Sequence, residues 1–518
     1  MNSPFAYTAK LAECGSKHLA MYLAIREAIA EGTLAAGEKL PSTRRLAELY
    51  GLSRGSVSLA YEMLAAEGFV QTGVGQGTFV AGTDDRVAPA AGSADARAEP
   101  AGPSPMTKWG RRLMEIQGEE ETRTAERTVR SDGRTAGPDQ QRGAEENVSF
   151  EPRGLGPERF PWLEWKSEVA RQWKNIGTSG TIRDDVQGSP DLRKAIAGRL
   201  RRERGIPCRE EDVVITSGSM QAIALLAQLL LDEGKTAVIE TPCYTGIRTA
   251  ARATGASLIA QRTDRGGIVP EDWEAQLLFV TPTRQYPTGV VLSYERRKAL
   301  LSWASKRRAW IVEDDYDSDF RWGGRPIEPL KSLDRDGRVI YVGTFSRSMS
   351  VSLRIGFAVV PGELFKPFML AKKLYDPYPT GFAEQQALAS WMASGGYDRH
   401  MRKTRRTLGK LERKLRDCLD KRLGGLFKTV PSDAGLHVYA TWEGTAEDYG
   451  RLVRASGMRG VGWRDGSIYD VPADDPAVQP RASAMFGFAH LNERQIEEGI
   501  SRIRLAAKAL NLLDDYRD

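Results

Sequence analysis

Apolar residues recur at helical spacing in three short segments near the start of the chain. They are Tyr22, Ile25 and Ile29 in the first, Leu46, Leu49 and Tyr50 in the second, and Val57, Ala60, Tyr61 and Leu64 in the third. The spacing i, i+3, i+4, i+7 of the third set predicts a helix with one buried face. Ser42 and Ser53 precede the second and third helices as N-caps. Two short apolar runs around a glycine turn follow, at 68–71 and 75–80, and predict a hairpin.

This order of helix, tight turn, helix and hairpin is how a recognition helix is presented to the major groove of DNA. Small residues at the start of the third helix, Gly55 and Ser56, let its backbone approach a duplex. Arg44 and Arg54 offer guanidinium groups to phosphates or guanine edges. A small helical module with solvated arginines fits the spacing equally well.

From residue 147 onward the pattern changes to short apolar strands that alternate with helical segments. This alternation predicts an α/β fold with a mostly parallel sheet. The expected strands are Asp212–Thr216, Ala237–Glu240, Leu277–Val280, Trp310–Glu313 and Val339–Val342.

A stretch rich in Ala, Gly, Pro, Arg and Glu separates the two patterned regions. We therefore expect a first domain at 15–82, a largely flexible linker at 83–146 and a second domain at 147–518. Within the linker, Trp109, Leu113 and Ile116 recur at helical spacing, which predicts a short helix at 107–117 that docks on a domain.

Charge and cysteine content exclude several classes of protein. The formal charge of the 518 residues is only +6, so its distribution matters more than its size. The four cysteines are scattered without a CxxC pair, which argues against a disulfide framework or a metal site and favours a reducing, cytoplasmic setting. The best apolar run, Ala222–Leu231, is too short to cross a bilayer, and Met1–Lys10 has no signal-peptide pattern, so no membrane association is expected.

Three segments of the second region carry candidate chemistry. Ser217, Gly218 and Ser219 form a small turn before a helix, where free N–H groups suit a phosphate. Asp314 and Tyr316 follow a strand, at the end where open parallel sheets bind ligands. The hydroxyls of Thr344 and Ser346, with Arg354, make a second phosphate grip. Taken singly, an ordinary strand-to-helix turn and a solvated acidic loop would explain the first two.

The segment Leu40–Val80 resembles the GntR-type winged helix, in the strings LPSTRRLAELYGLSRGSVSLAYEMLAAEGFV and GQGTFV. The resemblance implies that the chain binds a double-stranded DNA operator. The residues it implicates are Ser42, Thr43 and Arg44, the recognition-helix start Ser53, Arg54, Gly55 and Ser56, and the wing tip Gly75.

The second region resembles the fold-type I, class I/II aminotransferases, also through Thr281–Gly289, which is similar to their Pro-Thr-Gly loop. With the GntR-type head, the whole chain resembles the MocR-type regulators. This implies a homodimer that binds pyridoxal 5'-phosphate and responds to a small-molecule effector. In such a site Ser217, Gly218, Ser219, Thr344, Ser346 and Arg354 hold the phosphate, Tyr244 stacks on the ring, Asp314 pairs with the ring nitrogen and Tyr316 with the ring oxygen.

Two departures from these families change the interpretation. Arg347 stands where the family has its Schiff-base lysine, and a guanidinium cannot act as that nucleophile. Near the end of the chain, Ser467–Tyr469 lacks the arginine that grips an amino-acid carboxylate, although Arg464 or Arg481 could replace it. In addition, Arg284 occupies a position where many relatives have histidine.

These departures leave three interpretations of the second domain open. It binds pyridoxal phosphate without a covalent bond, it binds another phosphorylated or anionic ligand, or it is only a dimerisation body. The favoured function is a ligand-responsive DNA-binding regulator with no catalytic residue. The alternatives are an aminotransferase with an accessory DNA-binding head and a structural homodimer.

Overall fold

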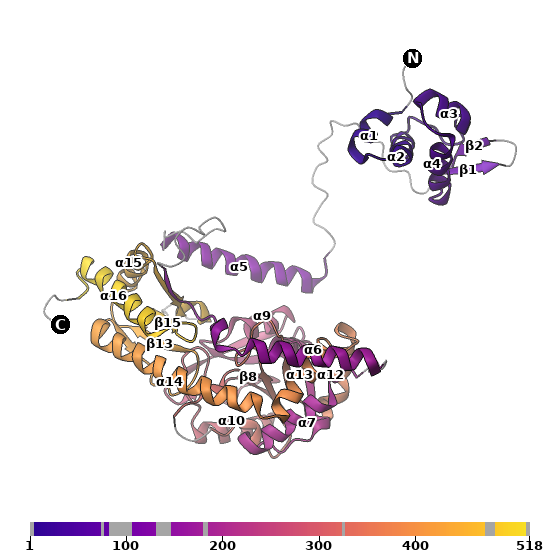
Figure 1. Cartoon of the computed structure of the whole chain (residues 1–518). Coiled ribbons are helices and arrows are strands. Elements are labelled where there is room, and N and C mark those ends of the chain that lie inside the picture. The colour runs from indigo at the N-terminus through magenta and orange to yellow at the C-terminus, as the bar shows by residue number, and fades with distance from the viewer. Residues whose placement is uncertain are drawn as a thin grey trace. The chain divides into compact units, whose positions relative to one another are not determined.

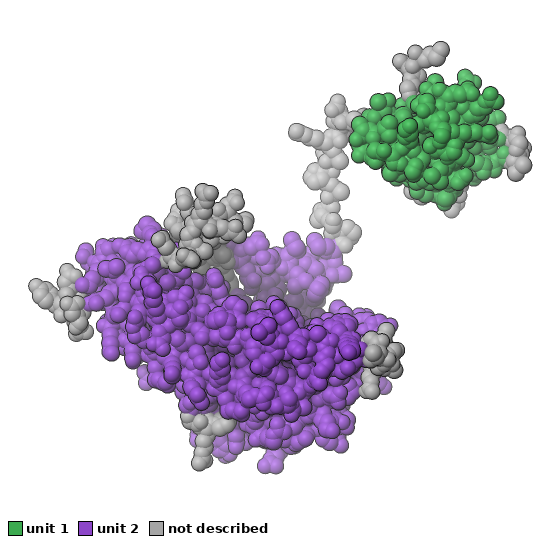
Figure 2. All heavy atoms as spheres, in the orientation of Figure 1, with its two compact units in different colours: residues 1–105 green, residues 106–518 purple. Residues whose placement is uncertain are grey.

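The computed structural model describes residues 5–73, 77–81, 106–130, 147–179, 185–323, 327–471 and 482–513, without the side chains of 123–130 and 177–179. The chain divides into two compact units, Met1–Pro105 and Met106–Asp518 (Figure 2). The boundaries predicted from composition, at 82 and 146, fall on residues outside or next to the described ranges.

The first unit is a helical domain with a two-stranded wing (Figure 1). Its elements are α1 (Tyr7–Cys14), α2 (Lys17–Ala30), α3 (Thr43–Tyr50), α4 (Arg54–Ala66), β1 (Val70–Gly73) and β2 (Gly77–Val80). The two caps form as predicted, since Ser42 accepts a hydrogen bond from the Arg45 N–H and Ser53 accepts one from the Ser56 N–H. The Tyr61 hydroxyl donates to the Pro41 carbonyl at 2.6 Å and so fixes α4 against the start of α3.

The predicted apolar stripe of α4 is confirmed, because Val57, Ala60, Tyr61 and Leu64 are all buried. In α3, Leu46 and Ala47 are buried, whereas Leu49, which shares their helical spacing pattern, is 51% exposed. Helix α1 was not predicted at all.

The second unit is built on an eight-stranded, mostly parallel sheet, which confirms the predicted fold class. Strand order is β4-β11-β10-β9-β8-β5-β6-β7, and β11 and β7 run antiparallel to their neighbours. The strands are β4 (Val213–Thr216), β5 (Thr236–Thr241), β6 (Ser257–Asp264), β7 (Gly267–Ile268), β8 (Leu277–Val280), β9 (Trp310–Asp315), β10 (Val339–Thr344) and β11 (Gly356–Val359).

The strands of this sheet are apolar because helices cover both of its faces. Ile239 and Val312 pack in one cluster with α8 (Ser219–Leu230) and α9 (Thr245–Ala253). Their strand neighbours Val238 and Ile311 pack on the opposite face with α10 (Tyr294–Arg307). Continuous apolar runs are typical of parallel strands that are buried on both sides.

A smaller five-stranded sheet follows, in the order β12-β13-β15-β14-β3. Its strands are β3 (Val148–Phe150), β12 (Phe427–Thr429), β13 (His437–Trp442), β14 (Val461–Asp465) and β15 (Ser483–Gly487). The remaining helices are α5 (Lys108–Arg130), α6 (Trp162–Ser179), α7 (Pro190–Arg199), α11 (Leu330–Leu333), α12 (Gly362–Tyr375), α13 (Phe382–Ala393), α14 (Gly396–Leu423), α15 (Ala446–Gly457) and α16 (Glu493–Ala509). The short helical turns are Pro157–Arg159, Leu200–Arg204, Glu210–Asp212, Ser318–Phe320 and Gly466–Tyr469.

Helix α5 belongs to the second unit and packs on α9. Arg252 forms a two-pronged ion pair with Glu119 at 2.7 and 2.8 Å, and Arg112 pairs with Glu233 at 2.9 Å. Ile116 is buried, as a docked helix requires, whereas Trp109 remains 47% exposed.

Other classes of site have no candidates in the described ranges. There, no helix is long and apolar enough to cross a membrane, and no group of acidic, His or Cys side chains could hold a metal ion. All four cysteines are free thiols.

Candidate functional site

The candidate residues of the second unit gather at one edge of the large sheet. Ser217–Ser219 follow β4, Tyr244 follows β5, and Asp314 lies near the end of β9. Thr344 ends β10, and Arg354 lies just before the antiparallel β11, whose first residue shares this edge. Parallel strands expose their carboxyl ends together, so segments far apart in sequence meet at this edge.

A tight cradle forms where β4 turns into α8. Gly218 has a φ of +82°, and a Cβ atom there would lie 2.6 Å from Nη2 of Arg354. A Cβ on Gly356 would lie 2.5 Å from the carbonyl carbon of Gly218. The Arg354 guanidinium donates to the Ser217 carbonyl at 3.2 Å, beside the N-terminus of α8. A cation beside a helix N-terminus is suited to a phosphate.

Three buried polar atoms next to the cradle have no hydrogen-bond partner within the described protein. They are Oδ1 of Asp314, the hydroxyl of Tyr316 and Oγ of Ser346. Buried polar atoms in proteins nearly always form hydrogen bonds, so each of these atoms is free to bond to a ligand atom. Pyridoxal phosphate fits this set, since its ring nitrogen, ring oxygen and phosphate would meet Asp314, Tyr316 and Ser346.

The buried position of Asp314 also changes the pH at which its carboxyl group ionises. The pKa of Asp314 is raised to about 7, mainly by burial and also by the nearby Asp315 and Asp317, while Arg347 opposes the rise. A protonated ring nitrogen against Asp314 would return that pKa toward its usual range.

An aromatic cluster lines the same edge around Tyr286. The Tyr286 ring packs edge-on against Tyr244 at 5.6 Å, Tyr316 at 5.3 Å and Tyr469 at 5.1 Å between ring centroids. Its hydroxyl donates to the Tyr469 hydroxyl at 3.0 Å. Neither Tyr286 nor Tyr469 was predicted as a site residue, although Tyr286 lies inside the Pro-Thr-Gly loop and Tyr469 within the Ser467–Tyr469 string.

Arg347 lies against this cluster, with its guanidinium carbon 5.8 Å from the centroid of the Tyr316 ring. Burial lowers the pKa of Arg347, but Tyr286, Asp317 and Tyr316 raise it above its usual value. The side chain of Arg347 therefore stays cationic.

Three further arginines were singled out in the sequence, and of these Arg284 keeps a buried Nη1 with no hydrogen-bond partner among the described residues. Arg284 is buried, lies 3.5 Å from Asp317 and donates to the Ala434 and His437 carbonyls. Arg464 pairs with Glu151 at 2.6 Å. Arg481 lies outside the described residues.

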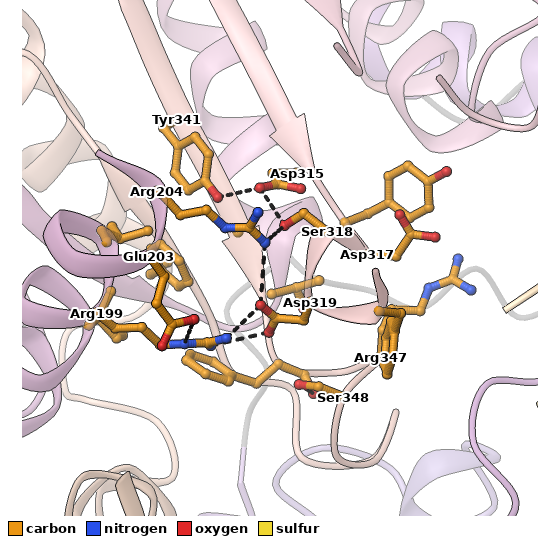
Figure 3. Close-up of a pocket in the computed structure, with 18 residues that line it drawn as sticks. Arg199, Glu203, Arg204, Asp315, Asp317, Ser318, Asp319, Tyr341, Arg347 and Ser348 are labelled. Atoms are coloured by element: carbon orange, nitrogen blue, oxygen red, sulfur yellow. Dashed lines mark hydrogen bonds and ion pairs between the residues drawn. The ribbon is translucent and has the colours of Figure 1, made fainter. Parts of the chain in front are cut away.

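A buried polar network lies around a small cavity next to the carboxyl ends of β9 and β10 (Figure 3). Asp319 accepts from Arg199 at 2.6 and 3.2 Å and from the Tyr397 hydroxyl at 2.9 Å. Burial raises the pKa of Asp319, yet Arg199 and Arg204 together hold it well below its usual range.

The same network reaches the loop that carries Arg347. The Tyr397 hydroxyl also lies within hydrogen-bond distance of Ser348 Oγ, at 2.8 Å, and Nε2 of His400 lies 2.8 Å from the Ser348 carbonyl. In Figure 3, Arg347 points away from Arg199 and Asp319. The loop is thus fixed by α14, while its arginine remains directed to the aromatic cluster.

In the first unit the candidate DNA contacts lie at the starts of α3 and α4. Ser42, Arg44, Ser53, Arg54 and Gly55 are exposed, and Thr43 and Ser56 are half-buried. Arg44 pairs with Glu48 at 3.2 Å, and since both side chains are largely exposed this pair is weak and easily exchanged for a phosphate. Gly75 lies outside the described residues.

Two family models match the chain. Residues 18–80 match the bacterial regulatory proteins of the gntR family, and residues 156–503 match the aminotransferase class I and II family.

Similar proteins combine both parts. The chain is 32% identical to a probable rhizopine catabolism regulatory protein, MocR, of Rhizobium meliloti, over 95% of this chain and 94% of that protein. It is 30% identical to the HTH-type pyridoxine biosynthesis transcriptional regulator PdxR of Corynebacterium glutamicum, over 80% of each chain.

Solved structures of aminotransferases resemble most of the chain. A Pyrococcus horikoshii kynurenine aminotransferase is 23% identical, with a TM-score of 0.65 over 75% of this chain and 94% of the enzyme. The α-aminoadipate aminotransferase LysN of Thermus thermophilus is 26% identical, with a TM-score of 0.62 over 71% of this chain and 94% of the enzyme.

Proposed function

Because the chain belongs to the MocR-type regulators, in which a GntR-type head is fused to a class I and II aminotransferase domain, we propose that it regulates transcription in response to a small ligand. The head, at 15–82, would bind the operator, and the domain at 147–518 would sense the ligand and form the dimer. Relatives of the same two-part organisation are named transcriptional regulators, which supports this division of roles.

The ligand that we propose is pyridoxal phosphate or a related anionic metabolite. Ser217, Gly218, Ser219, Thr344, Ser346 and Arg354 would hold its phosphate. Tyr244 would stack on the ring, while Asp314 and Tyr316 would take the ring nitrogen and ring oxygen. When bound, pyridoxal phosphate supplies an aldehyde and an electron-withdrawing ring. The unsatisfied atoms of Asp314, Tyr316 and Ser346 support this assignment.

We further propose that the domain has no transaminase activity, and the cationic Arg347 carries this part of the proposal. Transamination needs an amine at this position that bonds the cofactor and moves protons. A guanidinium that stays protonated does neither. Arg347 would instead hold negative charge on the ligand or fill the space of the lysine.

The proposed head contacts are Ser42, Thr43, Arg44, Ser53, Arg54, Gly55, Ser56 and Gly75. A dimer would present two such heads to two half-sites of an operator, as two-fold DNA-binding proteins do.

The test is a mobility-shift titration of the full chain on DNA from around its own gene, with and without pyridoxal phosphate. We expect binding in both cases and a change in affinity or in complex mobility when the cofactor is added. No DNA binding under either condition would refute the proposed regulator. In a separate activity assay, conversion of an amino acid to its keto acid would favour an aminotransferase with an accessory head.

A further inference from the structure

The excess positive charge of this protein does not lie in its DNA-binding head. Residues 15–82 contain six Lys or Arg and six Glu, so the head is formally neutral. Helix α14 alone carries eleven Lys or Arg and four Asp or Glu. Its formal charge of +7 exceeds the +6 of the entire chain.

Most of this charge lies on one solvent face of α14. Arg399, Arg402, Lys403, Arg406, Lys410 and Arg413 are all exposed, and we call them the α14 basic face. The spacings of three, four and seven residues place them along one side of the helix, over about 21 Å at 1.5 Å per residue. The opposite side of α14, with Tyr397, Met401, Leu408 and Leu415, is buried in the main core.

Among the described residues, no ion pair joins the α14 basic face to an acidic side chain. The ion pairs of α14 with described residues use other side chains, Lys414 with Glu497 and Arg416 with Glu412. Asp417 is the first exposed acid C-terminal to the face and marks its end.

This arrangement carries an electrostatic cost within the helix. Arg402, Arg406 and Lys410 are like charges at i, i+4 and i+8, which repel one another. Arg399, Arg402 and Lys403 also lie in the N-terminal turns, where the helix dipole disfavours cations. A polyanion placed along the face would relieve both effects.

We infer that the α14 basic face binds the phosphate backbone of duplex DNA that flanks the operator. The inference rests on the DNA binding proposed above for the head. A duplex carries about one phosphate charge per 1.7 Å of axis, so 21 Å of helix spans roughly a dozen charges on the two strands. A membrane surface fits less well, because α14 has no exposed large apolar side chain and a membrane-surface helix needs an apolar face.

A contact between the α14 basic face and DNA would compensate for the lack of net charge on the head. Phosphate neutralisation supplies much of the affinity of a DNA-binding protein. A head with no net charge gains little of it, so a second cationic surface on the same chain would add affinity without reading sequence.

The test compares the full chain with the triple variant Arg402→Ala, Arg406→Ala and Lys410→Ala. Alanine suits an exposed helical position, so the fold should be kept, which circular dichroism and a thermal melt would check. The control is Lys166→Ala, Lys366→Ala and Lys373→Ala, which removes three exposed charges from α6 and α12 of the same unit. Each protein is titrated, over a salt series, with a short duplex that holds only the operator and with a longer duplex that adds flanking DNA.

We expect the wild type and the control to bind the longer duplex more tightly and with a steeper salt dependence. The triple variant should bind the short duplex like the wild type but gain nothing from the flanks. Its log–log salt slope on the longer duplex should fall by about 0.9 for each phosphate that the variant no longer neutralises.

Equal binding of the longer duplex by the triple variant and the control would overturn the inference and leave an acidic protein surface as the better partner for α14. If the wild type does not bind the short duplex, DNA binding by the head, and with it the proposed function, is refuted instead.

Discussion

Arg354 leaves no room for a side chain at position 218, so a substitution of Gly218 tests whether Arg354 holds the phosphate of the proposed ligand. Gly218→Ala would place a Cβ 2.6 Å from Nη2 and 3.0 Å from Cζ of Arg354. Both atoms belong to the end of a flexible side chain, so the guanidinium would move away rather than the backbone. A hydrogen bond from a charged group contributes about 1.5–3 kcal/mol, and its loss should weaken phosphate binding about 10- to 100-fold.

The same substitution also strains the backbone, and this effect must be separated from the first. At Gly218, φ is +82° and ψ is +169°, a region almost restricted to glycine, so alanine should destabilise the fold by about 1–3 kcal/mol. Gly337 offers the control, since it has a φ of +68° and nothing within 4 Å of an added Cβ. Gly337→Ala should lower the melting temperature without touching the ligand.

Titration calorimetry with pyridoxal phosphate, together with thermal melts, would measure both effects. We expect the two variants to melt below the wild type and only Gly218→Ala to lose affinity. If Gly218→Ala binds pyridoxal phosphate within about two-fold of Gly337→Ala, Arg354 does not hold the phosphate and the cradle has been misassigned.

The two candidate sites lead to four more expected outcomes. Arg54→Ala should cost about 1–3 kcal/mol on the specific operator if Arg54 reads a base edge, and unchanged affinity in this variant and in Arg44→Ala would remove the basis for the DNA contacts. Arg347→Lys should create a covalent cofactor adduct that borohydride reduction and peptide mapping would locate, and the wild type should show none. Because the pKa of Asp314 is raised to about 7, ligand binding should tighten as pH rises through about 7 and Asp314 becomes ionised. The contribution of Asp314 to the free energy of unfolding should be fully present below about pH 4 and should be lost as pH rises from about 4 to about 7. Asp314→Asn should flatten both pH profiles. Sedimentation should show a dimer, and a monomer at micromolar concentration would count against a two-half-site operator.

Sequence patterns predicted the elements whose causes are local. The caps Ser42 and Ser53 and the stripe of α4 depend on residues within one or two helical turns, and all formed as expected. Five of the eight strands of the large sheet, β4, β5, β8, β9 and β10, were predicted for the same reason, because each contains a short apolar run, whereas β6, β7 and β11 were not predicted. The spacing of Leu46 and Leu49 did not settle which of them is buried, because burial on an eight-residue helix depends on the elements that pack against it.

Contacts between distant segments could not be read from the sequence. Tyr286 and Tyr469 share a hydrogen bond across 183 residues, and only the fold brings them together. The basic run in α14 is visible as a string of letters, but its division into an exposed face and buried partners follows from the packing of α14 on the core. The arginine at 347 was recognised by its place in a family pattern, whereas its contact with the Tyr316 ring needed coordinates.

The packing of Arg284 couples position 284 to two glycines that are distant in sequence. A Cβ at Gly435 would lie 2.3 Å from Nε of Arg284, and one at Gly289 would lie 3.0 Å from Nη1. The large guanidinium therefore fits only while both of these positions lack side chains. In genetic terms the three positions are epistatic: with arginine at 284, alanine at 289 or 435 would meet the guanidinium as well as a backbone with positive φ, so the effect of either substitution depends on the residue at 284.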